Sequence, residues 1–256
     1  MKAGSGSLPL LAYVIVIKNI LRQAAGILPF SFTKNQRYDR LTKKIIQSHL
    51  HHNSNCIDVG CHKGEIFDLF LKYAPGGHHF GFEPLPHLYK KLKEKYAGHN
   101  CTILPLALSD KKGPSNFNYV ISNPAYSGLL KRKYDRPVEK DTSIRVETDL
   151  LDNLIPSHLP IDLIKIDVEG GEFQVLKGAT RILSSYHPLI IFECGLGGSD
   201  IYGTTPSGIH TFLLDHHYQV SLLDDFLKRK PALDLSEFAR QFETGANYYF
   251  IAHAEE

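Results

Sequence analysis

The sequence predicts an α/β fold built on a doubly wound, mostly parallel β-sheet. After residue 50, short apolar runs of strand length alternate with longer segments that have helical periodicity. The run 161–168 is almost entirely apolar, which is typical of a central strand covered on both faces. Glycine turns follow two of the runs, at Gly60 and at Gly170. Repeated strand–helix units of this kind form parallel sheets with right-handed crossovers.

The individual elements follow from these runs in chain order. We expect strands at 56–60, 78–82, 101–108, 161–168, 188–192, 218–223 and 247–253, and helices at 40–50, 64–73, 86–96, 172–184, 207–216 and 235–242. The last two strands can pair as an antiparallel edge. By contrast, residues 113–150 are polar and carry two alternating runs, which predict an inserted β-hairpin with a long loop. A connection of this length inside a compact domain usually has a function.

Composition places the chain among ordinary globular proteins. Its 256 residues suffice for one large domain or two small ones, and 43% are hydrophobic and 22% charged. A net charge of +2 gives no general attraction to nucleic acid, so no nucleic-acid partner is expected. The 4 cysteines show neither a C-x-x-C pair nor metal-ligand spacing, which favours reduced, structural thiols in the cytoplasm.

The N-terminal segment has a different character. Residues 8–17 are strongly apolar, but Lys18 and Arg22 interrupt the run, so it is too short to span a bilayer. We expect an amphipathic helix over residues 8–25, within a helical segment 1–50 that precedes the main domain at 51–256. This helix either packs on the domain or makes peripheral contact with a membrane surface, and packing is slightly favoured.

The most informative motif is a strand that runs into a glycine turn. Asp58-Val59-Gly60 ends the first strand, and Gly64 opens the next helix. The second strand ends at Glu83-Pro84, where an acidic residue stands about 20 residues beyond the turn. Glycines allow the backbone to approach a ligand closely, and a carboxylate accepts hydrogen bonds from ribose hydroxyls. This combination predicts a nucleoside-binding site.

The turn also indicates which nucleoside cofactor binds. His62 stands where the nicotinamide fingerprint has its second glycine, which argues against a pyrophosphate-containing dinucleotide. The spacing of an ATP- or GTP-binding phosphate loop is absent as well. Asp58 can receive an ammonium group. S-adenosylmethionine (SAM), which has a ribose and a cationic amino-acid tail but no phosphate, fits these residues best.

Carboxylates gather where the predicted strands end. In doubly wound sheets, ligands bind at the carboxyl ends of the strands. The candidate cofactor-binding residues at these ends are Asp58, Gly60, Cys61, His62, Gly64, Glu83, Pro84, Ala107, Leu108, Ser109 and Asp167.

Lys165, Asp167 and Glu169 alternate with apolar residues, so they share one face of the central strand or its tip. The structural alternative is a buried ion pair between Lys165 and a carboxylate. We favour a catalytic role for Asp167 as general base, with Glu169 or Glu193 as second choice, and a structural role for Glu172. A magnesium ion held by Asp167, Glu169 and Glu193 is an alternative that ranks below a metal-free site.

These segments carry a resemblance to a known family. Asp58-Val59-Gly60-x-x-x-Gly64, Phe82-Glu83-Pro84 and Lys165-x-Asp167-Val168-Glu169-Gly170-x-Glu172 resemble the FkbM family of class I SAM-dependent methyltransferases, over roughly residues 50–200. The D-V-E-G-x-E segment is its specific part, whereas the glycine turn fits any class I methyltransferase. The family usually carries alanine where this chain has Cys61. The resemblance implies a seven-stranded sheet with an antiparallel seventh strand.

The resemblance also implies SAM-dependent O-methylation, often of a sugar or polyketide hydroxyl. Asn123, Tyr126 and Ser127 in the inserted segment are candidates for hydrogen bonds to such an acceptor. Two other functions stay open at this point: methylation of a nitrogen or nucleic-acid position, and a non-catalytic SAM-binding module. The N-P-P-Y type motif of amino-methylating DNA enzymes does not follow the 161–168 strand, which argues against the first of them.

Overall fold

The computed structural model describes residues 33–134 and 138–254, in two compact units that divide after residue 41. Helix α2 (Lys34–His49) begins in the first unit and ends in the second. The amphipathic helix expected at 8–25 lies outside the described residues. Among the helices of the described ranges, none has both the length and the apolar character needed to cross a membrane. Every strand of the described ranges belongs to the second unit.

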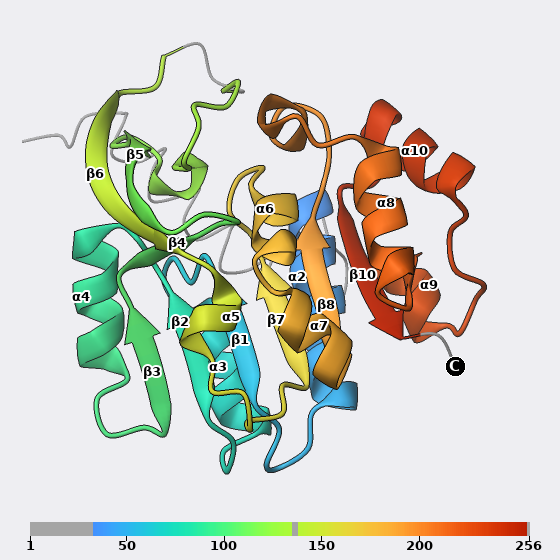
Figure 1. Cartoon of the computed structure of the whole chain (residues 1–256), viewed down its shortest axis with the longest axis horizontal. Helices are drawn as coiled ribbons and strands as arrows, with labels where there is room; N and C mark the ends of the chain where they lie inside the picture. Colours follow the sequence, from blue (N-terminus) through green and yellow to red (C-terminus); the bar gives the residue numbers. More distant parts are fainter. Residues whose placement is uncertain (1–32, 135–137, 255–256) are drawn as a thin grey trace, which may run out of the picture. The chain divides into compact units, whose positions relative to one another are not determined.

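A seven-stranded sheet forms the centre of the second unit (Figure 1). Its strands lie in the order β3-β2-β1-β7-β8-β10-β9, and only β10 runs antiparallel to its neighbours. The bounds are β1 (Cys56–Val59), β2 (His79–Phe82), β3 (Cys101–Leu104), β7 (Leu163–Ile166), β8 (Leu189–Glu193), β9 (Tyr218–Leu222) and β10 (Tyr249–Ala254). This confirms the predicted fold class and the antiparallel pairing of the last two strands.

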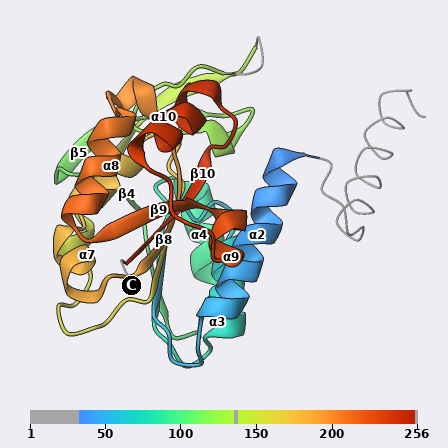
Figure 2. The ribbon, with the colours of Figure 1, turned by 90° about the vertical axis from the view of Figure 1, so that its right-hand side faces the viewer.

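Helices cover both faces of this sheet, as right-handed crossovers require. Figure 2 shows α3 and α4 on one side and α7 and α8 on the other. The helices are α3 (Glu65–Tyr73), α4 (Pro86–Lys95), α5 (Leu151–Leu154), α6 (Glu172–Lys177), α7 (Thr180–Tyr186), α8 (Pro206–Asp215), α9 (Leu223–Leu227) and α10 (Leu235–Thr244), with 3-10 turns η1 (Pro124–Tyr126) and η2 (Ser199–Tyr202). The central strands β1 and β7 are buried along their whole length, because both of their faces are covered.

The predicted strand at 101–108 is wrong in its extent. It stops at Leu104, because Pro105 has no N–H to continue the ladder. The following strand, β4 (Leu106–Leu108), turns away into a second sheet of order β4-β6-β5. The other strands of this sheet, β5 (Gly113–Val120) and β6 (Asp141–Asp149), pair antiparallel along their length, which confirms the inserted hairpin.

The predicted helix at 172–184 is interrupted at Gly178. A Cβ atom on Gly178 would lie 2.4 Å from the carbonyl oxygen of Ser109, so the break lets another segment approach the backbone closely. Helix α7 begins after this break, and a side chain from elsewhere in the chain accepts hydrogen bonds from its first turn. The carboxylate of Asp152, on α5, accepts from the backbone N–H groups of Arg181 (2.7 Å) and Ile182 (3.1 Å). A side chain distant in sequence therefore caps α7.

Replacing Asp152 by alanine should destabilise the protein without changing its fold. The first N–H groups of α7 would lose their carboxylate acceptor, and loss of a helix cap typically costs about 1–2 kcal/mol. We expect the free energy of unfolding, measured by urea denaturation, to fall by that amount. Asp215→Ala, which removes an exposed aspartate at the end of α8, should have a much smaller effect. Equal stabilities of the two variants would contradict the proposed capping.

Candidate active site

The candidate site lies at the carboxyl ends of β1, β2, β7 and β8. Strand β1 lies between β2 and β7. The chain continues from β1 through β2 to β3 at one edge of the sheet, and later adds β7 and β8 on the opposite side of β1. This point of reversal is where doubly wound sheets bind their ligands. The loops after these strands therefore converge on one region.

The glycine turn after β1 packs tightly against both neighbouring strands. The N–H groups of Gly60 and Cys61 donate to the carbonyl oxygen of Phe82, at 3.0 and 3.1 Å. Gly60 has φ +84°, and a Cβ atom there would lie 1.9 Å from the carbonyl oxygen of Asp167. Glycine is therefore required for steric reasons at this position. The close approach places the turn directly beside the end of β7.

Glu83 connects the turns after β1 and β2. Its carboxylate accepts from the backbone N–H of His62 (2.8 Å) and from that of Leu85 (2.9 Å), one bond to each oxygen. Burial raises the pKa of Glu83 to about 7, against the opposing effect of these two hydrogen bonds. Because a carboxylate oxygen can accept more than one hydrogen bond, Glu83 keeps capacity for a ribose diol.

Asp58 is a buried carboxylate at the carboxyl end of β1. Its side chain lies on β1 with 1% exposure, and neither of its oxygens accepts a hydrogen bond within the described part of the chain. Burial raises its pKa to about 6, although the charge of Lys165 opposes this shift. Buried polar atoms without partners are rare and call for a ligand, a water or a functional explanation. An ammonium-bearing ligand would supply the missing donors.

The remaining cofactor candidates divide into two groups. Cys61 is buried, and its Sγ lies 3.2 Å from the carbonyl oxygen of Asp58, as expected for a small structural residue of the turn. Pro84 directly follows Glu83. Ala107, Leu108 and Ser109 were expected at the carboxyl end of the third strand, and that placement is wrong because the strand ends before Pro105. Their role as cofactor contacts stays a prediction.

Asp167 directly follows β7 and holds a negative charge. Its Oδ2 atom accepts hydrogen bonds from the Nζ of Lys165 at 2.8 Å and from the hydroxyl of Tyr249 at 2.5 Å. Burial opposes ionisation, but the Lys165 charge and these hydrogen bonds together hold the pKa of Asp167 below its usual range. The ion pair considered as a structural alternative is thus present. It also keeps Asp167 ionised at the edge of the site.

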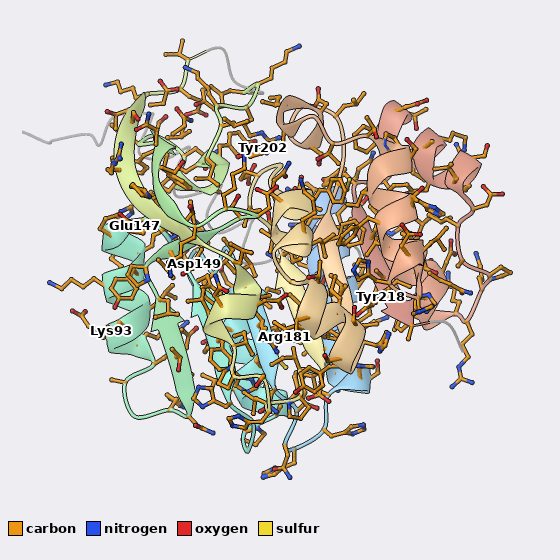
Figure 3. The ribbon with its side chains drawn as sticks, viewed as in Figure 1. Lys93, Glu147, Asp149, Arg181, Tyr202 and Tyr218 are labelled. Carbon is orange, nitrogen blue, oxygen red and sulfur yellow. The ribbon has the colours of Figure 1, made fainter. Side chains whose placement is uncertain are left out.

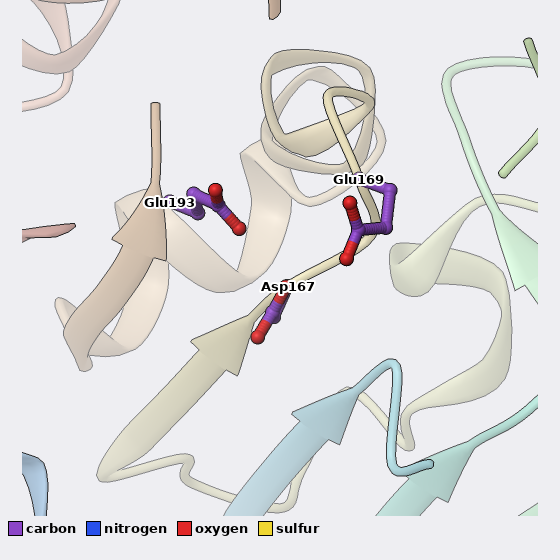
Figure 4. Close-up of side chains that lie close together, drawn as sticks. All are labelled: Asp167, Glu169 and Glu193. Atoms are coloured by element: carbon purple, nitrogen blue, oxygen red, sulfur yellow. The ribbon is translucent and has the colours of Figure 1, made fainter. Parts of the chain in front are cut away.

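Asp167, Glu169 and Glu193 come together as expected (Figure 4). One oxygen from each carboxylate lies within 4.8 Å of the others. Burial, and then the charge of Asp167, raise the pKa of Glu193 well above its usual range. The lowered pKa of Asp167 and the raised pKa of Glu193 thus distinguish two neighbouring carboxylates of the cluster.

Glu169 is turned toward the inserted segment. It has φ +61°, an uncommon conformation for a residue with a side chain, and forms an ion pair with Arg132. The guanidinium of Arg132 lies 5.0 Å from the ring centroid of Tyr126. Of the three acceptor-binding candidates, Tyr126 is therefore linked to the carboxylate cluster through Arg132.

The other two acceptor-binding candidates have local contacts in the insertion. The hydroxyl oxygen of Ser127, which is buried, accepts from the N–H of Val120 at 3.0 Å. The backbone carbonyl of Asn123 accepts from the N–H of Tyr126 at 2.9 Å. These bonds shape the turn around η1, and contact of either residue with an acceptor stays a prediction.

Glu172 orders the turn between β7 and α6. It is 1% exposed, and its Oε1 atom accepts from the N–H groups of Val168 (3.0 Å) and Gly170 (3.1 Å). These bonds fix the backbone that carries Glu169, so the contacts of Glu172 are structural.

The sequence did not predict three residues of this region: Tyr249, Arg132 and Tyr202. Tyr202, at the end of η2 (Figure 3), accepts a hydrogen bond from the N–H of Leu130 at 2.8 Å and so joins the insertion to the segment after β8. Each of these residues reaches the site from an element distant in sequence. No local pattern distinguishes them from other tyrosines and arginines.

Comparison with known proteins agrees with this arrangement. The sequence model "Methyltransferase FkbM domain" matches residues 58–220. The chain is 30% identical over 125 residues to "Hexuronic acid methyltransferase AglP" of Haloferax volcanii, covering 48% of this chain and 50% of the relative. It is 29% identical over 141 residues to "2-O-methyltransferase NoeI" of Sinorhizobium fredii, covering 50% and 58%. The matched regions thus span between half and three fifths of these relatives.

A solved structure shows the same fold. The crystal structure of methyltransferase FkbM from Methylobacillus flagellatus aligns with a TM-score of 0.50 at 16% identity, covering 80% of this chain and 44% of that one. At this identity the similarity concerns the fold alone. The family match, by contrast, extends over more than half of the chain and includes Asp58, Glu83 and the Asp167–Glu172 segment. The chain therefore belongs to the FkbM family of SAM-dependent methyltransferases.

Proposed function

We propose that the protein transfers a methyl group from SAM to a hydroxyl group of a saccharide or a similar hydroxylated metabolite. The observation that carries this proposal is the contact between Gly60 and Asp167, which puts an ionised carboxylate beside the turn suited to the donor. Two relatives are named for methylation of a hexuronic acid and for 2-O-methylation, and these names support a sugar-like acceptor.

The donor side of the site fits SAM in its charges and hydrogen-bonding groups. Glu83 retains acceptor capacity for the ribose hydroxyls. The carboxylate of Asp58, which accepts no hydrogen bond from the described residues, suits the ammonium group of the amino-acid tail. When bound, SAM supplies an electrophilic methyl group on a sulfonium. The glycine turn contributes a backbone surface without a side chain at Gly60, where a ligand can lie close to the chain.

The acceptor side provides a base for the hydroxyl. An aliphatic hydroxyl is a weak nucleophile, so a carboxylate within hydrogen-bonding distance assists by taking its proton. The pKa of Asp167 is held low, whereas the pKa of the neighbouring Glu193 is raised well above its usual range. Asp167 is therefore the member of the cluster assigned to take the proton of the hydroxyl. Lys165 and Tyr249 hold Asp167 in place, and orientation of this kind supplies much of the rate of such a displacement.

Loss of the Glu83 carboxylate should greatly weaken donor binding. In Glu83→Ala, the ribose hydroxyls lose their acceptor, and the N–H groups of His62 and Leu85 lose theirs. We expect saturable calorimetric binding of SAM and S-adenosylhomocysteine to the unaltered protein, and a loss of at least about 100-fold in affinity in the variant. Glu94→Ala, on the exposed side of α4, is the matched control. Binding of NAD instead of SAM would contradict the proposed donor.

Donor affinity should increase as the pH rises from 6 to 8. In the ligand-free protein Glu83 has a pKa of about 7 and is mostly protonated at pH 6, whereas ribose hydroxyls bind best to the ionised form. Ionisation between these two pH values should tighten S-adenosylhomocysteine binding about tenfold, as measured by calorimetry. Glu83→Gln cannot ionise, so its binding should vary much less with pH. An equal pH dependence in the variant would assign the effect to another group.

Removal of the Asp167 charge should reduce catalysis much more than donor binding. Asp167→Asn keeps the size of the side chain but takes away its proton-accepting ability, and a general base typically contributes about 10²- to 10⁴-fold to the rate. We expect a fall of this size in single-turnover methyl transfer, with the affinity for SAM changed only a few-fold. Asp215→Asn, at an exposed position, should behave like the unaltered protein. Full activity of Asp167→Asn would show that another group is the base.

A further inference from the structure

We infer that Arg132 binds the acceptor and selects for sugars that carry a carboxylate, such as uronic acids. The inference rests on the proposed function, because it concerns the acceptor of the same site. Arg132 lies in the insertion, in the stretch between η1 and β6, and its guanidinium reaches the carboxylate cluster at the end of β7. It is therefore positioned on the acceptor side of the site.

One donor of the Arg132 guanidinium has no acceptor among the described residues. Its Nη1 atom donates to Glu169, whereas its Nε has no acceptor among the residues that the structure describes. Nε and Nη2 form the second fork of a guanidinium, and this fork matches the two oxygens of a carboxylate. The side chain is 14% exposed, so part of it is open to an acceptor that enters the site.

The surroundings hold this arginine in the site. One face of its guanidinium lies over the ring of Tyr126, with 5.0 Å between Cζ and the ring centroid. The neighbouring Leu130 is tied to Tyr202 beyond β8, so the segment is anchored on both sides of the cluster. An arginine restrained in this way loses little freedom when it binds an anion, which favours specific recognition.

The site contains two paired cations. Lys165 pairs with Asp167, and Arg132 pairs with Glu169. Of the two cations, Lys165 is the more deeply buried and is occupied by Asp167. Arg132 is the cation that an incoming carboxylate meets. A doubly charged phosphate would face two fixed carboxylates with a single arginine, which makes a carboxylate the better match.

The test uses two acceptors that differ in one group. Methyl β-glucuronoside and methyl β-glucoside share the same ring, but only the first carries a carboxylate. The unaltered protein should use the glucuronoside with a kcat/KM about 10- to 100-fold higher, as expected for a charge-assisted hydrogen-bonded pair. In Arg132→Gln this preference should fall to within about threefold, mainly through the KM of the glucuronoside. Arg132→Lys should keep part of the preference, because it retains the charge without the fork.

Lys133→Gln is the matched control, since it removes the same charge from an exposed neighbour in the same segment. It should leave the preference unchanged. Saturation-transfer NMR of both glycosides, with S-adenosylhomocysteine present, separates binding from turnover. Binding of the glucuronoside that depends on Arg132, without methylation of either sugar, would support the inference and refute the proposed function. Equal use of both sugars, a preference that survives in Arg132→Gln, or binding of neither sugar would overturn the inference.

Discussion

The close approach between the backbone at Gly60 and the carbonyl of Asp167 is the constraint on which the rest of the site depends. It is possible only without a side chain at Gly60. It brings together the turn after β1, whose own hydrogen bonds reach β2, and the carboxylates that come after β7. The residues that we propose for binding the methyl donor and the proposed base, Asp167, thereby become neighbours, although more than 100 residues separate Gly60 from Asp167 in the chain. A larger residue at Gly60 would separate the two halves of the site.

Several ionisable groups are clustered around this contact. Asp58, Asp167, Glu193 and Lys165 lie close to one another, and removing charged groups from water is costly unless they are paired. The pairing of Lys165 with Asp167 limits this cost, and the raised pKa of Glu193 favours its neutral form. Asp58 remains without a partner in the described residues. Such an arrangement is typical of sites where binding and catalysis, more than folding, determine the choice of residues.

The inserted sheet and the main sheet make different contributions. The main sheet supplies Asp58, Glu83 and Asp167 from the ends of its strands, and these positions follow from its strand order. The insertion reaches the same region through Arg132 and through the bond from Leu130 to Tyr202. In our proposals the main sheet holds the methyl donor and the base, and the insertion recognises the acceptor. This division would allow acceptor choice to vary without disturbing the donor site.

The sequence by itself determined the strand–helix alternation, the glycine turn and the carboxylates at the strand ends, because periodicity and turn chemistry act over a few residues. It also predicted the inserted hairpin. Tertiary structure decided what depends on distant contacts: the turn of β4 into a second sheet and the division of α6 from α7 around Ser109. It also brought Tyr249 to Asp167 across 82 residues and Arg132 to Glu169 across 37. Such pairs leave no local pattern, since chain packing alone sets which side chains meet.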